Sequence, residues 1–262
     1  MSACGLIMKP CFEVKETGFK RLIRVLRQGV ITYIFLPLYK RFIHNRCINN
    51  EILKHVIKDE FNKIYWYSYR ETWKNTYWLG VQTEKCPTDL WIYQEIIQDL
   101  KPDVIIEAGT FLGGSALYLA SICELVGNGK VISIDIAEQE GLPRHSRITY
   151  LMGSSVSDDI ISKVRGMITQ HDKVMVILDS AHEKDHVLKE LIIYSKFVTK
   201  GSYIIVEDTN INGNPIRPGY GPGPMEAVRD FLGNNNSFVI DRSMEKFYLS
   251  FNPDGYLKKV KL

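Results

Sequence analysis

Three carboxylates stand at the ends of two apolar segments in the second half of the chain. Asp179 ends the segment 173–179, and Glu207 and Asp208 end the segment 202–208. If these segments are neighbouring strands, about 4.8 Å apart, their acids crowd at the sheet edge where open α/β folds bind ligands. Crowded carboxylates repel one another, and oxygen ligands suit Mg²⁺ or a similar hard cation. We therefore predict that Asp179, Glu207 and Asp208 bind a divalent cation; solvated strand-end acids are the alternative.

A histidine follows the first of these acids by three residues. His182 would lie just past the strand end, beside the predicted cation, where an imidazole could take a proton from a substrate hydroxyl. We predict His182 as the catalytic base, acting with Asp179. Glu207 and Asp208 can both reach the site only if the strand breaks there, because consecutive strand residues point to opposite faces.

The same stretch also matches a zinc-protease pattern. His182-Glu-Lys-Asp-His186 reads as HExxH, with Glu207 as a possible third ligand. That motif needs both histidines on one helix, whereas His182 closely follows an apolar strand. A zinc hydrolase is therefore the weaker alternative.

A glycine-rich turn lies upstream, between an apolar segment and a helical pattern. Gly109 and Gly113 allow close approach to a ligand, and the helix start offers free N–H groups. The spacing is not that of the dinucleotide fingerprint. The acid Glu107 suits a ligand with an ammonium group, such as S-adenosylmethionine (SAM), and Asp135 ends the next segment, where acids bind ribose hydroxyls. The predicted cofactor residues are Glu107, Gly109, Thr110, Gly113, Ser115, Asp135, Ser154 and Asp179; a ligand-free turn is the alternative.

Short apolar runs alternate with helical patterns over most of the chain, which indicates a parallel sheet covered on both faces. Two later runs, 237–241 and 246–251, are separated by only four residues and should pair antiparallel. We predict an α/β fold with a doubly wound, mostly parallel seven-stranded Rossmann-like sheet that ends in this hairpin. The predicted strands are 103–107, 130–135, 147–152, 173–179 and 202–208, and the helices begin near 113, 158, 184 and 225.

The beginning of the chain differs in character from the rest. Residues 1–48 carry nine Lys/Arg and two Glu, a net +7, so the remainder of a chain of net charge +3 carries −4. An acidic body disfavours nucleic acid as a partner. The five cysteines lack paired spacing, which argues for reduced thiols, and the run 30–38 is too short to span a bilayer. We expect a cytoplasmic protein with a helical N-terminal extension over 1–80 and a catalytic domain over 81–262.

Several segments remain open between a functional and a packing role. Residues 18–48 fit an amphipathic basic helix at a membrane surface or subunit boundary, or an ordinary solvated helix. Aromatic residues recur every four positions, as one helical stripe that would pack on the body, cover an acceptor or contact a second subunit: Phe61, Tyr65, Tyr69, Trp73 and Tyr77. Arg217 and Tyr220, in a Pro- and Gly-rich loop, are candidate acceptor contacts. A homo-oligomer is expected.

Longer motifs resemble a known family from about Trp78 to the end of the chain. The most specific are Pro218-Gly-Tyr-Gly-Pro-Gly-Pro224, followed by Glu226-Ala-Val228, and Phe251-Asn-Pro-Asp-Gly-Tyr-Leu257. They resemble the cephalosporin hydroxylase/rhamnosyl O-methyltransferase family of class I methyltransferases. Further matching pieces are Lys85-Cys-Pro87-Thr-Asp89, Tyr93-Gln-Glu95, Gly113-Gly-Ser-Ala116, Asp179-Ser-Ala-His182 and Val206-Glu-Asp-Thr209.

The resemblance implies a SAM-dependent O-methyltransferase that needs a divalent cation such as Mg²⁺. It places the cation on Asp179, Glu207 and Asp208, the cofactor on Glu107, Gly109 and Asp135, and the base at His182. The expected acceptor is a hydroxyl of a sugar or of a related natural product or glycolipid. A non-catalytic binding or scaffold protein on this fold is the alternative, although such a protein has no need of all these residues.

Overall fold

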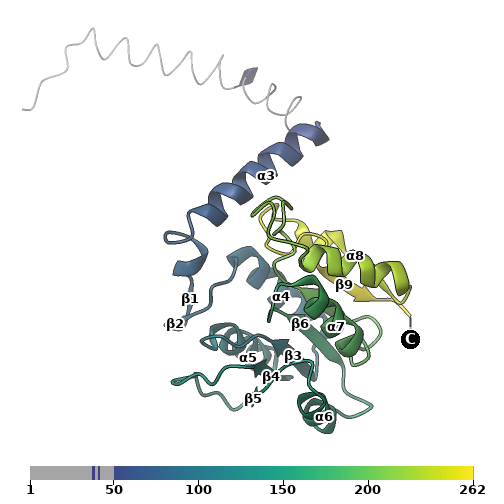
Figure 1. The fold of residues 1–262 in the computed structure, drawn as a ribbon. Coiled ribbons are helices and arrows are strands. Elements are labelled where there is room, and N and C mark those ends of the chain that lie inside the picture. Colours follow the sequence, from purple (N-terminus) through teal and green to yellow (C-terminus); the bar gives the residue numbers. More distant parts are fainter. Residues whose placement is uncertain (1–36, 39–40, 42–49, 262) are drawn as a thin grey trace, which may run out of the picture. The chain divides into compact units, whose positions relative to one another are not determined.

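The structure is a computed structural model that describes residues 37–38, 41 and 50–261 (Figure 1). The chain divides between Ile57 and Lys58 into two compact units, and the second holds the sheet. The predicted boundary after residue 80 stays a prediction. The predicted amphipathic segment 18–48 lies outside the described residues, apart from 37–38 and 41. Among the described residues, no helix has the length and apolar character needed to cross a membrane.

One seven-stranded sheet forms the centre of the second unit, in the order β5-β4-β3-β6-β7-β9-β8. Strands β5, β4, β3, β6 and β7 run parallel to one another, and β9 is antiparallel to both β7 and β8. This arrangement confirms the predicted fold class. The strands are β3 (Val104–Ala108), β4 (Lys130–Asp135), β5 (Ile148–Met152), β6 (Val174–Leu178), β7 (Tyr203–Val206), β8 (Phe238–Ile240) and β9 (Tyr256–Lys259).

Helices cover both faces of the sheet because alternate strand residues are apolar on both sides. Ile106 of β3 packs in a core with α6, α7 and α8, whereas its neighbour Ile105 packs in a second core with α4 and α5. The helices are α3 (Glu51–Tyr67), α4 (Pro87–Leu100), α5 (Gly114–Val126), α6 (Asp158–Gly166), α7 (Lys184–Tyr194) and α8 (Pro224–Asn234). The short elements are η3 (Trp73–Asn75), η4 (Arg242–Glu245) and the hairpin β1 (Tyr77–Trp78) and β2 (Val81–Gln82).

The predicted strand over 246–251 is wrong. The antiparallel partner of β8 is β9, and residues 246–255 form turns and loop. Asp89, on α4, accepts hydrogen bonds from the Ser250 hydroxyl at 2.7 Å and from the Phe251 N–H at 2.8 Å. Phe251 packs edge-on against both Trp66 and Trp73. Ser250 and Phe251 are therefore held without a strand partner, whereas Phe247 and Tyr248 are exposed.

The predicted aromatic helix is also wrong beyond Tyr67, where α3 ends. The Thr72 hydroxyl donates to the carbonyls of Tyr65 and Ser68, and the Trp73 indole N–H donates to the Trp66 carbonyl. These side chains occupy carbonyls that a continued helix would use. Trp66 and Trp73 stack with centroids 4.7 Å apart. Of the predicted stripe, Tyr65 and Trp73 pack in the cluster with Trp66 and Phe251, and the remaining members are exposed: Phe61, Tyr69 and Tyr77.

Candidate functional site

The candidate site is a cleft of about 640 Å³ at the carboxyl ends of β3, β4, β6 and β7. Its wall includes most of the predicted cofactor residues: Gly109, Thr110, Ser115, Asp135, Ser154 and Asp179. His182, Asp208 and Arg217 also line it. Strands β6 and β7 are direct neighbours, as predicted, which brings Asp179 and the acids after Val206 to one place.

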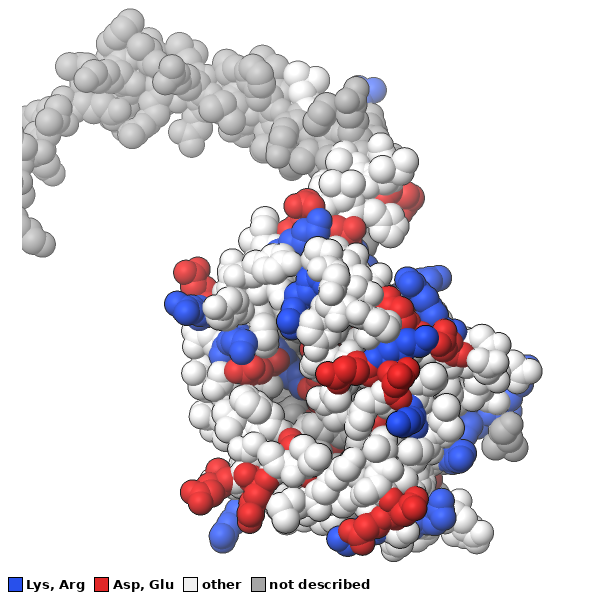
Figure 2. Space-filling model, viewed as in Figure 1, with Lys and Arg blue, Asp and Glu red and all other residues white. Residues whose placement is uncertain are grey.

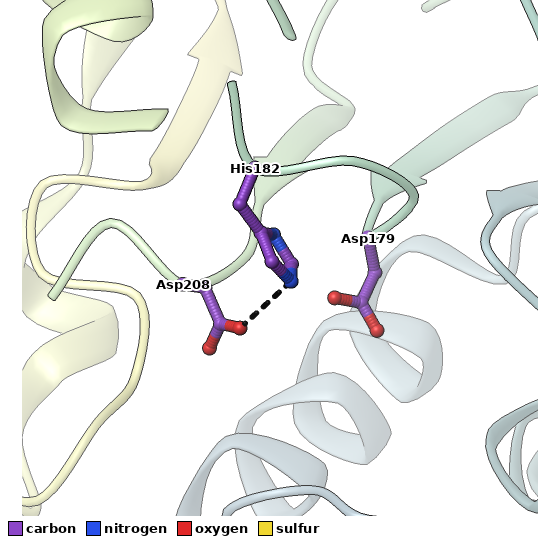
Figure 3. A group of neighbouring side chains, drawn as sticks. All are labelled: Asp179, His182 and Asp208. Atoms are coloured by element: carbon purple, nitrogen blue, oxygen red, sulfur yellow. Dashed lines mark ion pairs between the residues drawn. The ribbon is translucent and has the colours of Figure 1, made fainter. Parts of the chain in front are cut away.

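Two of the three predicted cation ligands lie together with the predicted base (Figure 3). Asp179, His182 and Asp208 each present one ligand atom, all within 4.8 Å of one another. The His182 Nε2 atom lies 3.3 Å from the Asp208 Oδ2 atom. Burial raises the pKa of Asp208 to about 6, although the nearby His182 opposes this shift.

Glu207, the third predicted ligand, is turned to a different set of partners. Its Oε1 atom lies 2.6 Å from the Lys85 Nζ atom and accepts a hydrogen bond from the Tyr93 hydroxyl at 2.9 Å. The strand does break, as the prediction required: β7 ends at Val206, and Asp208 has a φ of 54°. The break points Glu207 toward α4 and leaves Asp208 in the cleft. No described residue donates a hydrogen bond to Glu207 Oε2.

Lys85 is the main residue of the site whose role the sequence did not indicate. Its side chain is 5% exposed, and its ammonium pairs with both Asp179 and Glu207. Burial alone would lower the pKa of Lys85. The attraction of the two carboxylates is larger than this effect and raises the pKa of Lys85 above its ordinary value. Lys85 therefore supplies a fixed positive charge among the acids at this sheet edge.

The Lys85→Met variant should be strongly destabilised. Removing one partner of a buried ion pair leaves uncompensated charge and costs about 3–5 kcal/mol. Urea unfolding in EDTA measures this, because no divalent cation then replaces the lost charge. The control Lys163→Met removes the exposed pair with Asp159, and it should leave the unfolding midpoint unchanged. Equal midpoints for both variants would show that the Lys85 pairs do not stabilise the fold.

Close packing, as well as access to the cleft, explains the glycines of the turn. A Cβ atom on Gly109 would lie 1.9 Å from the Asp179 carbonyl oxygen, and its φ is +105°. A Cβ atom on Gly113, which does not line the cleft, would lie 2.7 Å from Pro143. Gly109 therefore lets the turn pass directly against the backbone of a predicted cation ligand.

Gly109→Ala should lower the free energy of unfolding by about 3 kcal/mol, because a steric clash adds to backbone strain. Gly201→Ala is the matched control, since Gly201 also has a positive φ, +86°, but nothing lies within 4 Å of its would-be Cβ. Strain alone should cost that variant about 1 kcal/mol. Chemical denaturation compares the two, and equal losses would contradict the steric argument.

Glu107 lies beneath the glycine turn rather than in the open cleft. It is fully buried, and its Oε2 atom accepts a hydrogen bond from the Ser133 hydroxyl at 2.6 Å. Its Oε1 atom is buried without a hydrogen-bond partner. Burial raises the pKa of Glu107, although Lys85 opposes this shift. Glu107 can therefore influence a ligand in the cleft only across the turn above it.

Asp135 holds the same turn from the neighbouring strand. Its Oδ2 atom accepts hydrogen bonds from the N–H groups of Thr110 and Phe111, both at 2.9 Å. The Ala137 N–H donates to Oδ1 at 2.9 Å. The carboxylate therefore rims the cleft at the end of β4, which is the position predicted for contact with a ribose.

The two predicted acceptor residues have different positions. Arg217 lines the cleft, and its guanidinium lies 4.1 Å from the centroid of the Tyr220 ring. The Arg217 N–H donates to the Tyr67 hydroxyl at 3.0 Å. Tyr220 does not line the cleft, but its ring contacts the Arg217 guanidinium, which does. Trp66 and Trp73 line the same end of the cleft.

The zinc-hydrolase alternative does not fit the positions of its two histidines. His182 precedes α7, whereas His186 lies in its first turn, and His186 Nε2 lies 3.4 Å from Glu190 Oε1. His182 faces Asp208 instead. The HExxH pair therefore does not converge on one ion.

The charged surface is mixed in sign on the face shown in Figure 2, where Lys and Arg are interspersed with Asp and Glu. No continuous basic field covers this face of the described residues.

The chain matches known proteins over most of its length. The family model "Rhamnosyl O-methyltransferase/CmcI" matches residues 70–260. The rhamnosyl O-methyltransferase of Mycobacterium tuberculosis is 35% identical over 208 residues, which cover 77% of this chain and 84% of that protein. The rhamnosyl O-methyltransferase of Mycobacterium leprae is 34% identical over 221 residues, 80% of this chain and 95% of that protein.

Solved structures show the same fold. An apo structure of CmcI has 21% sequence identity and a TM-score of 0.57, and the match covers 72% of this chain and 78% of that chain. A Mg-SAM structure of CmcI has 20% identity and a TM-score of 0.55, with the same coverage. The resemblance found in the sequence motifs is confirmed. The chain belongs to the rhamnosyl O-methyltransferase/CmcI family.

Proposed function

We propose that the protein is a SAM-dependent O-methyltransferase that uses a divalent cation to methylate a sugar hydroxyl. The observation that carries this proposal is the convergence of Asp179, His182 and Asp208 within 4.8 Å in a cleft that also contains the glycine turn and Asp135. A cation site, a base and a nucleoside site then share one cavity. The names of the relatives support the reaction class.

The residues along the β3–β4 side of the cleft fit SAM. Asp135 can accept a ribose hydroxyl, since its Oδ1 atom accepts only the Ala137 N–H and retains a lone pair. The buried Glu107 carboxylate, with one unpartnered oxygen, adds negative potential beneath the turn where a cationic amino-acid and sulfonium portion would lie. When bound, SAM supplies a methyl group on a sulfonium that leaves as a neutral thioether.

The residues at the ends of β6 and β7 fit a hard divalent cation. We propose that Asp179 and Asp208 hold it, with Glu207 contributing through Oε2, the oxygen that Lys85 and Tyr93 leave unbonded. Carboxylate oxygens are the ligands that Mg²⁺ prefers. A bound divalent cation supplies Lewis acidity that lowers the pKa of a hydroxyl beside it.

His182 is proposed as the base that removes the proton of the acceptor hydroxyl. With Asp208 Oδ2 3.3 Å away, the Nε2 atom of a neutral His182 carries the proton, because an ionised carboxylate only accepts. Nδ1, which no described residue hydrogen-bonds, is then the atom that accepts the proton. Asp208 orients the ring and stabilises the imidazolium that forms, as the third group does in an arrangement of nucleophile, base and orienting residue.

The acceptor end of the cleft fits a sugar. Trp66, Trp73 and Arg217 combine flat apolar rings with a fixed cation, which suits a ring that carries both C–H faces and hydroxyls. The relatives are named for rhamnosyl acceptors, so we propose a rhamnosyl or similar sugar hydroxyl as the methyl acceptor.

Transfer of labelled methyl from SAM to p-nitrophenyl α-L-rhamnopyranoside tests the proposal. We expect a methyl ether with Mg²⁺ and none with EDTA. Catechol is the matched non-sugar acceptor. Transfer to catechol alone would contradict the sugar assignment, equal transfer with EDTA would contradict the cation, and no SAM binding at all would favour the scaffold alternative.

A further inference from the structure

A cluster of polar side chains lies at the end of the cleft opposite the acceptor. It joins the end of β5, the end of β6 and the first turns of α7 through four residues: Ser155, Ser180, His186 and Glu190. Ser155, Ser180 and His186 line the cleft, and Glu190 lies behind them, fully buried. The mechanism above makes no use of this cluster.

Glu190 holds the cluster together. Its Oε1 atom accepts hydrogen bonds from the Ser155 hydroxyl and, at 2.7 Å, from the Ser180 hydroxyl. His186 Nε2 lies 3.4 Å from the same oxygen and 3.3 Å from the Ser155 hydroxyl. A buried carboxylate is costly, and here it anchors an imidazole at the wall of the cleft.

The anchoring sets which nitrogen of His186 is available. A carboxylate only accepts hydrogen bonds, so the Nε2 atom of a neutral His186 carries the proton. The contact with Glu190 also raises the pKa of His186, so the titrations below are run at alkaline pH, where the imidazole is neutral. Nδ1 is then an acceptor, and no described residue donates to it. The cleft wall therefore presents one unpaired acceptor at a fixed position.

The position along the cleft indicates what that acceptor meets. In the proposed function, Asp135 contacts the ribose of SAM, and the glycine turn lies beside the amino-acid portion of SAM. The base of the nucleoside must extend to the other side of the ribose, where Ile136, Ser154 and His186 line the cleft. Ile136 is 77% exposed, and its apolar side chain offers a surface on which a purine could stack.

We propose that His186, held by Glu190, is a specificity-determining residue that recognises the 6-amino group of the adenine of SAM through Nδ1. This inference rests on the proposed function and adds which group of the cofactor the protein recognises. A 6-oxo purine would place an acceptor against an acceptor, so the site would reject it.

Calorimetric titration of S-adenosyl-L-homocysteine and S-inosyl-L-homocysteine tests the proposal, because the two ligands differ at the purine 6-position and its adjoining ring nitrogen. The wild-type protein should bind the adenosyl ligand about 10- to 100-fold more tightly, the range for an unpaired buried polar group. In His186→Phe, which keeps a flat ring without the acceptor, the ratio should fall below about 3-fold.

The ratio separates recognition from structural damage. A merely disturbed cleft would weaken both ligands equally and leave the ratio unchanged. His171→Phe is the matched control, since His171 is exposed and lies outside the cleft wall, and it should keep the wild-type ratio. In Glu190→Gln the amide oxygen still accepts from Ser155 and Ser180, but the charge that holds His186 is lost. The ratio should therefore fall in this variant as well.

Three results would overturn the proposal. The first is an unchanged ratio in His186→Phe, and the second is equal binding of both ligands by the wild-type protein. The third is a preference for the inosyl ligand, which would mean that Nδ1 donates. Binding of neither ligand would instead contradict the proposed function itself, so the two failures are distinguishable.

Discussion

Asp179→Asn should abolish cation-dependent methyl transfer, with a rate loss of about 10³-fold or more. Asp179 contributes a carboxylate to the three-residue group in Figure 3 and also pairs with Lys85. Asn keeps the shape and one oxygen but removes the charge that attracts a divalent cation. A Lewis acid is worth several kcal/mol of transition-state stabilisation, and each 1.4 kcal/mol is about tenfold in rate. Turnover with SAM, a rhamnoside and increasing Mg²⁺ measures the loss.

Two controls accompany this variant. S-adenosyl-L-homocysteine should bind within about threefold of wild type, a change of well under 1 kcal/mol. Asp159→Asn makes the same change at an exposed acid on α6 and should leave turnover unchanged. Full activity of Asp179→Asn at the wild-type Mg²⁺ concentration would remove Asp179 from the cation site.

His182→Gln should lower the turnover number by about 10²- to 10⁴-fold, the range for loss of a positioned general base. Gln can still donate to Asp208 but has no nitrogen that takes up a proton. Because the imidazole is proposed as a base rather than a ligand, Mn²⁺ affinity should remain within about threefold of wild type. Single-turnover kinetics and Mn²⁺ titration followed by electron paramagnetic resonance measure the two quantities.

The two roles of His182 separate clearly in this experiment. A collapse of Mn²⁺ affinity would show that His182 is a ligand. Wild-type turnover would show that another group, or water, removes the proton. The control His171→Gln alters an exposed histidine outside the cleft and should change neither quantity.

The architecture of the site follows from local sequence patterns because those patterns repeat. Apolar segments of strand length, separated by helices, indicate parallel strands whose carboxyl ends meet at one edge. Asp135, Asp179 and Asp208 each follow such a segment, so their convergence could be predicted. The break after β7 could also be predicted, since Glu207 and Asp208 are followed closely by Asn210 and Asn212.

The partners of these residues could not be predicted in the same way. Lys85 precedes α4, and its two acids lie 94 and 122 residues away. Nothing local distinguishes a lysine that will be buried from one at the surface. Glu207 illustrates the consequence, because its position was predicted but its contacts with Lys85 and Tyr93 were not.

The last strand was misplaced for a related reason. Residues 246–251 and 256–259 are both suitable strands by composition, and the choice depends on Asp89, which binds Ser250 and the Phe251 N–H from α4. Local patterns do not reveal such a distant partner. The sequence likewise indicated His186 only as part of the HExxH motif, whereas its contacts with Ser155 and Glu190 indicate a different role.

A crystal structure grown with Mn²⁺ and S-adenosyl-L-homocysteine tests the central claim most directly. The anomalous scattering of manganese locates the ion independently of the fitted protein. The account predicts one anomalous peak in contact with the carboxylates of Asp179 and Asp208, with the ribose hydroxyls of the ligand at Asp135. An ion held by His182 and His186, or a cleft that contains the nucleoside but no ion near Asp179, would contradict it.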